Sequence, residues 1–237
     1  MVLCVLRTGD AVASVSARRG EFAEWIQASS EGAWQGAWIE HDARAEVPFP
    51  EVTSLSGVII TGSSALVTER AAWMLRTEGY IRELVAARVP ILGICFGHQI
   101  VGQALGGLVA KNPRGREIGT VNVTIEGQDV LLEGFPAEFH ANASHLESVV
   151  NLPDGARLLG RTDLEPHAMY AVGDCVRCVQ FHPEFDQDVT RGYIEARADR
   201  IREEGGDPDR LHACVLETPL ARSLVRRFVQ EFVTRAK

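Results

Sequence analysis

The sequence predicts an α/β protein: one domain over residues 1–237, with a mostly parallel, twisted sheet flanked by helices in a flavodoxin-like arrangement around a nucleophile elbow. Two observations lead to this fold. Short apolar runs alternate with helix-like stretches in the N-terminal half, which is typical of parallel sheets covered on both faces. One apolar run ends in a glycine-flanked cysteine, Cys95, and passes directly into a helical pattern. No repeat, low-complexity segment or linker divides the chain, which favours a single domain.

The N-terminal half supplies the alternating strands and helices. The expected strands are short apolar runs, at residues 2–7, 37–41, 56–60 and 90–94. The expected helices show apolar periodicity, at residues 21–28 and 69–88, and a third follows Cys95. Because chemistry in parallel sheets gathers at the carboxyl ends of the strands, Cys95 lies where a site is expected.

The C-terminal half has a different sequence pattern. Its β-like runs predict further strands, some antiparallel, added to the same sheet, at residues 117–125, 168–172 and 175–181. Two helices are expected near the C-terminus, at residues 189–204 and 211–235. Large apolar side chains recur every four residues in the second helix and predict one buried stripe, made of Leu216, Leu220, Leu224, Phe228 and Phe232.

Composition excludes several classes of function. Lys and Arg total 24 against 32 Asp and Glu, a net charge of −8, so general binding to nucleic acid or to an anionic membrane is not expected. No apolar run approaches the length of about 18–20 residues that a membrane-spanning helix needs. The five scattered cysteines do not form a disulfide framework, and the chain start lacks a signal-peptide pattern, so we expect a cytoplasmic protein.

Cys95 has the surroundings of a nucleophile. Gly93 and Gly97 flank it at the spacing that a sharp strand-to-helix turn requires, because a side chain at either place would strike a neighbouring element. The positive end of the following helix favours a thiolate, and the backbone N–H of Phe96 can donate to an oxyanion. The alternative is a buried cysteine that acts only as a small apolar side chain.

The stretch around His182 can supply the base. Pro183 favours an extended conformation for His182, and residues two apart in an extended chain point to the same side, so His182 and Glu184 can interact. A carboxylate that accepts from one ring nitrogen fixes the tautomer and stabilises the imidazolium. A solvated turn and a metal-binding pair are the alternatives for these two residues.

These two stretches together resemble the class I glutamine amidotransferase family. The matching segments are Gly-Ile-Cys-Phe-Gly-His-Gln at residues 93–99 and Gln-Phe-His-Pro-Glu-Phe at residues 180–185. Thr-Gly-Ser at residues 61–63 stands where the family has its oxyanion loop, and residues 144–149 are similar to its Ser-His-x-Asp-x-Val segment. Asn-Pro-Arg-Gly-Arg-Glu-Ile-Gly at residues 112–119 resembles a region of stand-alone proteins related to the GMP synthase glutaminase domain.

The resemblance implies roles for individual residues. Cys95 would attack the side-chain amide of glutamine and form a γ-glutamyl thioester, His182 would carry the proton to the departing ammonia, and Glu184 would orient His182. The backbone N–H groups of Gly62 or Ser63, together with that of Phe96, would bind the oxyanion. Gln99 and His145 are the implied substrate-binding residues.

The sequence also departs from the family pattern. The usual Gly-Gly-Pro of the oxyanion loop is Gly-Ser-Ser at residues 62–64, which leaves open which loop N–H is the second donor. Glu147 stands in place of the family's aspartate. Arg116 and Glu117 are either substrate-pocket or structural residues.

Cofactors and partners follow from what the sequence lacks. It contains no phosphate-binding loop and no ATP-pyrophosphatase loop, so no cofactor is predicted, and ammonia would pass to a separate synthetase chain or to solvent. A metal site at Cys175 and Cys178 is not expected, because residues three apart on a strand point to opposite faces. Two alternatives to a glutaminase stay open: a γ-glutamyl peptidase with the same triad, and a regulatory or ammonia-supplying subunit that depends on a partner.

Overall fold

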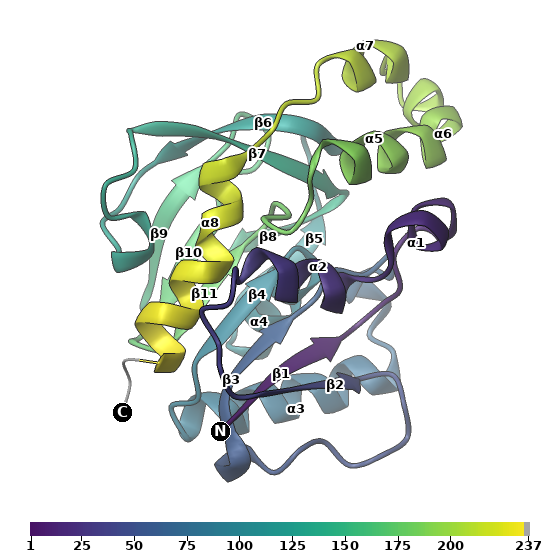
Figure 1. Cartoon of the computed structure of the whole chain (residues 1–237). Coiled ribbons are helices and arrows are strands. Elements are labelled where there is room, and N and C mark those ends of the chain that lie inside the picture. Colours follow the sequence, from purple (N-terminus) through teal and green to yellow (C-terminus); the bar gives the residue numbers. More distant parts are fainter. Residues whose placement is uncertain (235–237) are drawn as a thin grey trace.

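The computed structural model describes residues 1–234, in which helices flank a nine-stranded sheet (Figure 1). One half of the sheet is parallel and has the order β2-β1-β3-β4-β11. Its strands are β1 (Val2–Arg7), β2 (Ala37–Asp42), β3 (Leu55–Ile60), β4 (Ile91–Ile94) and β11 (Val176–Val179). The other half continues from β11 through antiparallel pairs, with β10 (Met169–Val172), β9 (Ala156–Arg161), β6 (Glu117–Ile125) and β7 (Glu138–His145).

The sheet is therefore mixed, and the parallel arrangement that we expected for most of it is confined to one half. The two halves meet at β11, which is parallel to β4 and antiparallel to β10. A parallel pair needs a crossover connection of a dozen or more residues, usually a helix. The chain between β10 and β11 is too short for a crossover, and β6 returns to β7 without an α-helix, so these neighbours pair antiparallel.

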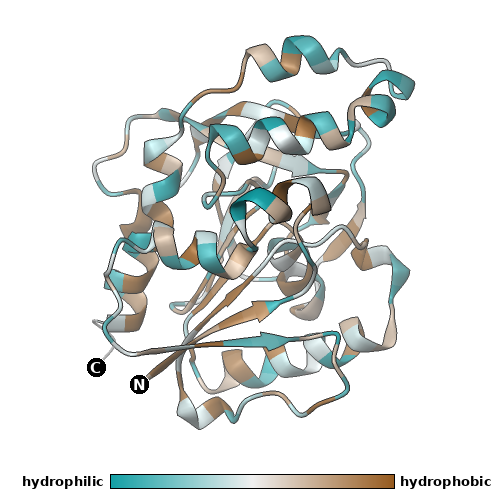
Figure 2. Ribbon diagram, turned by 45° about the vertical axis from the view of Figure 1, so that its right-hand side comes forward, coloured by the Kyte–Doolittle hydropathy of each residue, from teal (hydrophilic) through white to brown (hydrophobic). Residues whose placement is uncertain are grey.

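Alternating residues of the strands build two cores, one on each face of the sheet. In β1, Leu3 and Val5 belong to one core, whereas Cys4 and Leu6 belong to the other. The first core is covered by α2 (Phe22–Ser29) and α8 (Pro219–Phe228), and the second by α3 (Ala72–Ala86) and α4 (Phe96–Ala104). Figure 2 shows the same division, with apolar strands at the centre and polar outer faces on the surrounding helices.

The helices α1 (Ala13–Arg19) and α5 (Gln187–Ala196) lie at the carboxyl ends of the parallel strands. The arrow of β1 points toward the end of the sheet where these two helices pack together (Figure 1). Two shorter helices follow α5, namely α6 (Ala198–Glu203) and α7 (Pro208–Ala213). A separate two-stranded sheet is made by β5 (Leu108–Lys111) and β8 (Glu147–Asn151). Short 3-10 helices lie at η1 (Val52–Ser54), η2 (Val67–Glu69) and η3 (Val130–Leu132).

The C-terminal helices differ from the expected pattern. The chain at residues 189–204 divides into α5 and α6, and the second predicted helix is interrupted between α7 and α8. Pro219 is the first residue of α8; proline lacks an N–H and so starts a helix rather than continuing one. The helix α8 continues into a π-helical turn, Val229–Thr234, and Arg235 lies outside the described residues.

The interruption also corrects the expected apolar stripe. Leu224, Phe228 and Phe232 are buried, whereas Leu216 is 45% exposed and Leu220 is 38% exposed. Leu216 precedes α8 and so cannot follow its periodicity.

The described surface carries no long apolar helix. None of the helices in residues 1–234 is long and apolar enough to cross a membrane.

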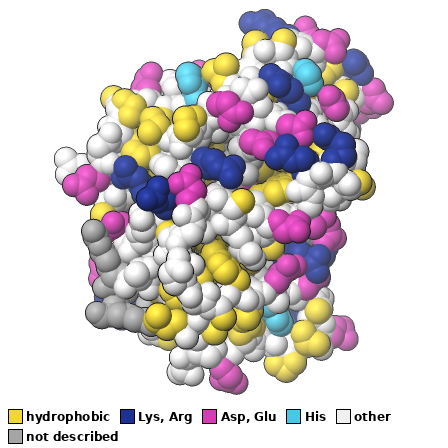
Figure 3. All heavy atoms as spheres, viewed as in Figure 1, with side chains coloured by type: hydrophobic (Ala, Val, Ile, Leu, Met, Phe, Trp, Pro, Cys, Tyr) yellow, Lys and Arg dark blue, Asp and Glu magenta, His cyan; other side chains and the backbone are white. Residues whose placement is uncertain are grey.

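On the face in Figure 3, basic and acidic side chains alternate over the end of the molecule formed by α5, α6 and α7. Two ion pairs within α6 join Arg202 to Asp199 and Arg200 to Glu203.

Candidate active site

Cys95 lies in a strained turn between β4 and α4. Its φ of 52° and ψ of −102° place a non-glycine residue in the left-handed half of backbone space, a conformation that persists only when the surroundings enforce it. A Cβ on Gly93 would lie 2.7 Å from the carbonyl oxygen of Gly97, and a Cβ on Gly97 would lie 2.3 Å from that of Ile60. Glycine is therefore required on both sides, and the backbone of β3 holds the turn in place.

His182 and Glu184 meet immediately after β11. Nδ1 of His182 lies 2.7 Å from Oε1 of Glu184, and both side chains are buried. The Phe185 N–H donates to the His182 carbonyl at 3.3 Å, so the two side chains meet across a turn rather than along the extended chain that we expected. The expected contact itself is present. The His182 N–H is fixed by the Asn142 carbonyl at 2.7 Å, which connects this turn to β7.

Aromatic rings fix the orientation of the His182 imidazole. The ring of Phe185 stacks on it at 3.9 Å between centroids and an interplanar angle of 12°. Phe22 from α2 lies parallel at 6.1 Å. A Cβ on Gly62 would lie 2.7 Å from Cε1 of His182, so the loop after β3 passes directly against the ring.

The charges of Cys95 and His182 stabilise one another. Burial is the largest influence on the pKa of Cys95 and would raise it, but the neighbouring His182, through its charge and a hydrogen bond, lowers that pKa below the ordinary value. Burial would lower the pKa of His182, but Glu184 and Cys95 raise it to about 10. The arrangement therefore favours a thiolate beside an imidazolium. Sγ also lies 3.8 Å from the Ser144 carbonyl oxygen.

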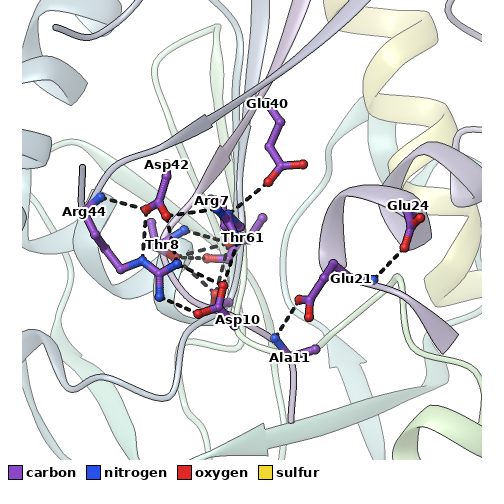
Figure 4. A network of polar contacts seen from close by, with 11 residues as sticks. Arg7, Thr8, Asp10, Ala11, Glu21, Glu24, Glu40, Asp42, Arg44 and Thr61 are labelled. Carbon is purple, nitrogen blue, oxygen red and sulfur yellow. Dashed lines mark hydrogen bonds and ion pairs between the residues drawn. The ribbon is translucent and has the colours of Figure 1, made fainter. Parts of the chain in front are cut away.

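The loop after β3 is tied to the end of β1. Oγ1 of Thr8 donates to the carbonyl oxygen of Thr61 at 2.9 Å (Figure 4). It also donates to the carbonyl oxygen of Gly62 at 3.1 Å. The Thr61 carbonyl also accepts from the Gly97 N–H at 3.1 Å, which joins the loop to the first turn of α4. Among residues 1–234, no acceptor is found for the N–H groups of Gly62, Ser63 or Phe96.

A cluster of ion pairs stabilises the same corner of the molecule. Arg7 pairs with Asp10, Glu40 and Asp42, and Arg44 pairs with both aspartates (Figure 4). The Arg44 hydrogen bonds hold the pKa of Asp10 and Asp42 below the usual range of a carboxyl group. This network fixes the chain on either side of Thr8.

Gln99 lies next to Cys95 and is held by the interior. Its Nε2 donates to the Glu147 carbonyl at 2.8 Å and to Oε1 of Gln180 at 3.0 Å. Both amide hydrogens are thus used within the protein, and no hydrogen bond to the amide oxygen is found in residues 1–234.

His145 is fixed at both ring nitrogens. Nε2 lies 2.9 Å from Oε2 of Glu117, and Nδ1 lies 2.9 Å from the Glu147 carbonyl oxygen. Burial would lower the pKa of His145, but the contact with Glu117 raises it above the ordinary value. Glu117 is therefore a partner of His145, whereas Arg116 pairs with Glu204 through two nitrogens at 2.8 and 3.1 Å. The Glu147 carboxylate accepts from the backbone of η2 and so has a local structural partner.

Two adjoining pockets bring most of the expected site residues together. One, of about 390 Å³, is lined by Cys95, Gln99 and His145. The other, of about 420 Å³, is lined by His182, and the two share Ser63. The Phe96 side chain lines neither pocket and packs against Trp73, at 5.6 Å between ring centroids.

Both pockets also contain residues that the sequence analysis missed. Ser144 and Arg197 line each of them. Ser144 falls inside the segment that resembled the family, so its place could have been found from the sequence. Arg197 lies at the junction of α5 and α6, where no motif distinguishes it.

Metal ligands do not gather in the described part of the chain. In residues 1–234, no group of three or more His, Cys, Asp or Glu could hold an ion. Cys178 is buried, and burial raises its pKa to about 12, so this side chain stays a thiol.

A comparison with protein families assigns the chain. Residues 37–197 match the family described as glutamine amidotransferase class-I. The chain belongs to this family. The match begins at β2 and ends at Arg197, so this class I glutamine amidotransferase carries α6, α7 and α8 beyond the matched region.

Curated relatives of this class I glutamine amidotransferase carry two kinds of name. Gamma-glutamyl peptidase 4 of Arabidopsis thaliana is 34% identical over 155 residues, which are 62% of this chain and 62% of that protein. A glutamine-hydrolyzing GMP synthase subunit of Saccharolobus solfataricus is 36% identical over 140 residues, 58% of this chain and 71% of that protein. The chain thus matches less than two thirds of the length of the peptidase.

The solved structures support the fold. A glutamine amidotransferase from Thermotoga maritima superposes with a TM-score of 0.76 at 21% identity, over 98% of this chain and 97% of the other. Another, from Methylobacillus flagellatus, has a TM-score of 0.68 at 21% identity and covers 99% and 92% of the two chains. The mixed sheet with flanking helices is thus shared along almost the whole length.

Proposed function

We propose that this protein hydrolyses γ-glutamyl amides through a thioester on Cys95, with glutamine as the first candidate substrate. The observation that carries the proposal is that buried Cys95, in its strained turn, interacts with buried His182, whose Nδ1 is held by Glu184. Residues 1–237 act as one catalytic domain in this proposal. The strand order β2-β1-β3-β4-β11 supports the flavodoxin-like description of its parallel half.

The first half of the reaction releases the amine. The Cys95 thiolate forms a bond to the δ-carbon of the donor, and the carbonyl π electrons move to the oxygen. The His182 imidazolium, held by Glu184, gives its proton to the nitrogen, the C–N bond breaks, and ammonia leaves.

The second half regenerates the enzyme. Neutral His182 now takes a proton from water, and the resulting hydroxide attacks the thioester carbonyl. The C–S bond breaks, glutamate leaves, and the Cys95 thiolate again faces an imidazolium. Glu184 keeps the same ring orientation in both halves because it holds Nδ1.

We assign the oxyanion donors to Phe96 and Ser63. The Thr61 carbonyl faces the Gly97 N–H, so the Gly62 N–H of the same trans peptide points away from α4. The Gly62 carbonyl faces Thr8, which turns the Ser63 N–H away from β1. Two preformed donors would each lower the barrier by about 3 kcal/mol.

The substrate-binding roles of Gln99 and His145 are part of the same proposal. Gln99 has its amide oxygen left to accept from the donor's α-ammonium group, because its N–H groups are bound internally. His145 contributes a wall of the pocket, since both of its ring nitrogens are already held.

A γ-glutamyl peptide is the second candidate substrate. A further cavity of about 560 Å³ adjoins the Cys95 pocket and shares Arg116, Leu146 and Arg200 with it. This volume is large enough for a leaving group much bigger than ammonia, and the similarity to gamma-glutamyl peptidase 4 supports the same candidate. The similarity to part of a GMP synthase supports a third arrangement, in which a separate synthetase chain receives the ammonia.

The test offers the purified protein glutamine and, separately, γ-glutamyl dipeptides. Ammonia released from glutamine and abolished by Cys95→Ala supports the first candidate, whereas amine release from the dipeptides alone supports the second. Stimulation of glutamine hydrolysis by an added synthetase supports the third. No turnover of either donor, with no labelling of Cys95 by a glutamine-like electrophile, would show that the proposal is wrong.

A further inference from the structure

Arg197 lies beside the candidate catalytic residues without belonging to them. It separates α5 from α6, and it lines both the pocket that contains Cys95 and the pocket that contains His182. Its guanidinium lies over the ring of Tyr193, 4.7 Å from the centroid. The ring of Tyr193 in turn packs against the ring of Phe185, at 4.6 Å between centroids, and Phe185 stacks on His182.

The guanidinium of Arg197 has no acidic partner in residues 1–234. Its Nη1 is buried and makes no hydrogen bond within those residues. Nearby arginines are different, because Arg116 pairs with Glu204, and Arg200 pairs with both Glu203 and Glu204. Burial lowers the pKa of Arg197, and the charge of Arg116 lowers it further, whereas Tyr193 and Cys95 raise it.

A partly buried cation without a counter-charge raises the free energy of the folded protein, and binding an anion lowers it. Removing a guanidinium from water without a counter-charge costs several kcal/mol, and a planar guanidinium is suited to bind a carboxylate with two hydrogen bonds. The stacking on Tyr193 holds the guanidinium in position before any ligand arrives.

We propose that Arg197 binds the α-carboxylate of the γ-glutamyl donor, an inference that rests on the proposed function. The α-carboxylate lies a few bond lengths from the δ-carbon that Cys95 attacks, so both ends of one glutamyl group can occupy the joined pockets that Arg197 lines. Arg197 is then a specificity residue: it selects donors that carry a free α-carboxylate and excludes amides that lack one. A carboxylate on the leaving group is the other source of the same chemistry.

The first experiment compares two chromogenic donors. γ-Glutamyl-p-nitroanilide carries the α-carboxylate and has no carboxylate on its leaving group, whereas 4-aminobutyryl-p-nitroanilide lacks both. We expect the wild type to favour the first donor, and Arg197→Gln to lower kcat/KM for it by about 30-fold while leaving hydrolysis of the second unchanged. Arg197→Lys should recover part of the loss. The matched control is Arg202→Gln on α6, whose side chain pairs with Asp199 and lines neither pocket.

The second experiment separates binding from turnover. Cys95 is labelled either with a glutamine-like chloroketone that carries the α-carboxylate or with iodoacetamide, which has none. Arg197→Gln should slow the chloroketone about 30-fold and leave the iodoacetamide rate within about twofold, because the thiolate itself is maintained by His182.

The outcomes distinguish the two proposals. If Arg197→Gln retains the wild-type preference between donors and between labels, the α-carboxylate assignment is wrong, while the proposed hydrolase function is unaffected. If the variant loses activity only toward dipeptides with a C-terminal carboxylate, Arg197 binds the leaving group instead. If the wild type neither turns over γ-glutamyl donors nor reacts faster with the chloroketone than with iodoacetamide, the proposed function itself fails.

Discussion

The two sides of the candidate site are positioned in different ways, one by backbone geometry and the other by side-chain contacts. On the side of β3, β4 and α4, the geometry comes from backbone: two glycines, a strained Cys95 and a loop whose carbonyls are held by Thr8. On the side of β11 and β7, it comes from charged and aromatic side chains around His182. The first side fixes where a reacting atom can sit, and the second sets which atoms carry charge. Substitutions on the two sides should therefore fail in different ways.

The largest effect is expected on the side-chain half. Glu184→Gln keeps the shape of the residue but removes the charge that favours the His182 imidazolium, so we expect kcat to fall by about 10³-fold with little change in KM. Steady-state kinetics with the best γ-glutamyl donor measure this. The melting temperature serves as the control, and a change confined to KM would contradict an orienting role.

Gly97→Ala should disrupt the turn at Cys95, which belongs to the side of the site that backbone geometry positions. The new Cβ would lie 2.3 Å from the Ile60 carbonyl oxygen, and neither backbone can move without distorting β3 or α4. We expect a loss of about 3 kcal/mol in the free energy of unfolding and about 10²-fold in kcat. Urea titration measures the first quantity. Gly79→Ala in α3, where the nearest heavy atom to a new Cβ is 4.0 Å away, is the matched control and should retain stability and activity.

The pH dependence of alkylation should connect the two sides. The pKa of Cys95 is lowered and that of His182 is raised to about 10, so the thiolate–imidazolium pair exists between those two values. Iodoacetamide should therefore react at an almost constant rate as the pH falls below the ordinary thiol value of about 8.5, and slow only below the lowered pKa. Glu184 also raises the pKa of Cys95 directly, but His182 has the larger influence on that pKa, and Glu184 supports the His182 imidazolium. In Glu184→Gln the fall should therefore begin at higher pH, with a rate near pH 7 about tenfold lower. Identical profiles for the two proteins would contradict the coupling.

The smallest effect is expected at Thr8. Thr8→Val keeps the volume of the side chain but removes the hydroxyl that holds the Thr61 and Gly62 carbonyls. We expect kcat to fall about fivefold, because the proposed Ser63 donor is less well fixed, with no change in the alkylation rate of Cys95. Equal losses in both measurements would place the effect on Cys95 rather than on the loop.

The sequence was most informative where structure depends on neighbouring residues. The Gly-x-Cys-x-Gly spacing predicted the turn at Cys95 because a side chain at either glycine would clash with nearby backbone. At Gly93 the clash would be with Gly97, and at Gly97 it would be with Ile60 of the adjacent strand. The predicted strand at residues 117–125 matches β6. The sequence also predicted a contact between His182 and Glu184, and the structure brings the two together through a turn that the extended interpretation did not include. The catalytic roles of these residues stay predictions.

Features that depend on distant segments could not be read in the same way. Some antiparallel strands were expected in the C-terminal half and are present, but apolar patterns do not specify the order in which β10, β9, β6 and β7 pair. Pro219 is the first residue of α8, but the four-residue spacing of the leucines on either side of it led us to predict one continuous helix. Arg197 reaches the site because the chain changes direction between α5 and α6, and an arginine within a helical pattern gives no local signal of that position.

The alternation along β1 links catalytic competence to the folding transition. Its residues serve opposite cores in turn, so slipping by a single position would exchange Leu3 and Val5 with Cys4 and Leu6 between the two faces. The same slip would carry Thr8 out of reach of Thr61 at the end of the strand. Partially folded forms with a misaligned β1 would therefore lack the proposed activity, and we expect the loss of that activity in denaturant to coincide with the loss of the sheet.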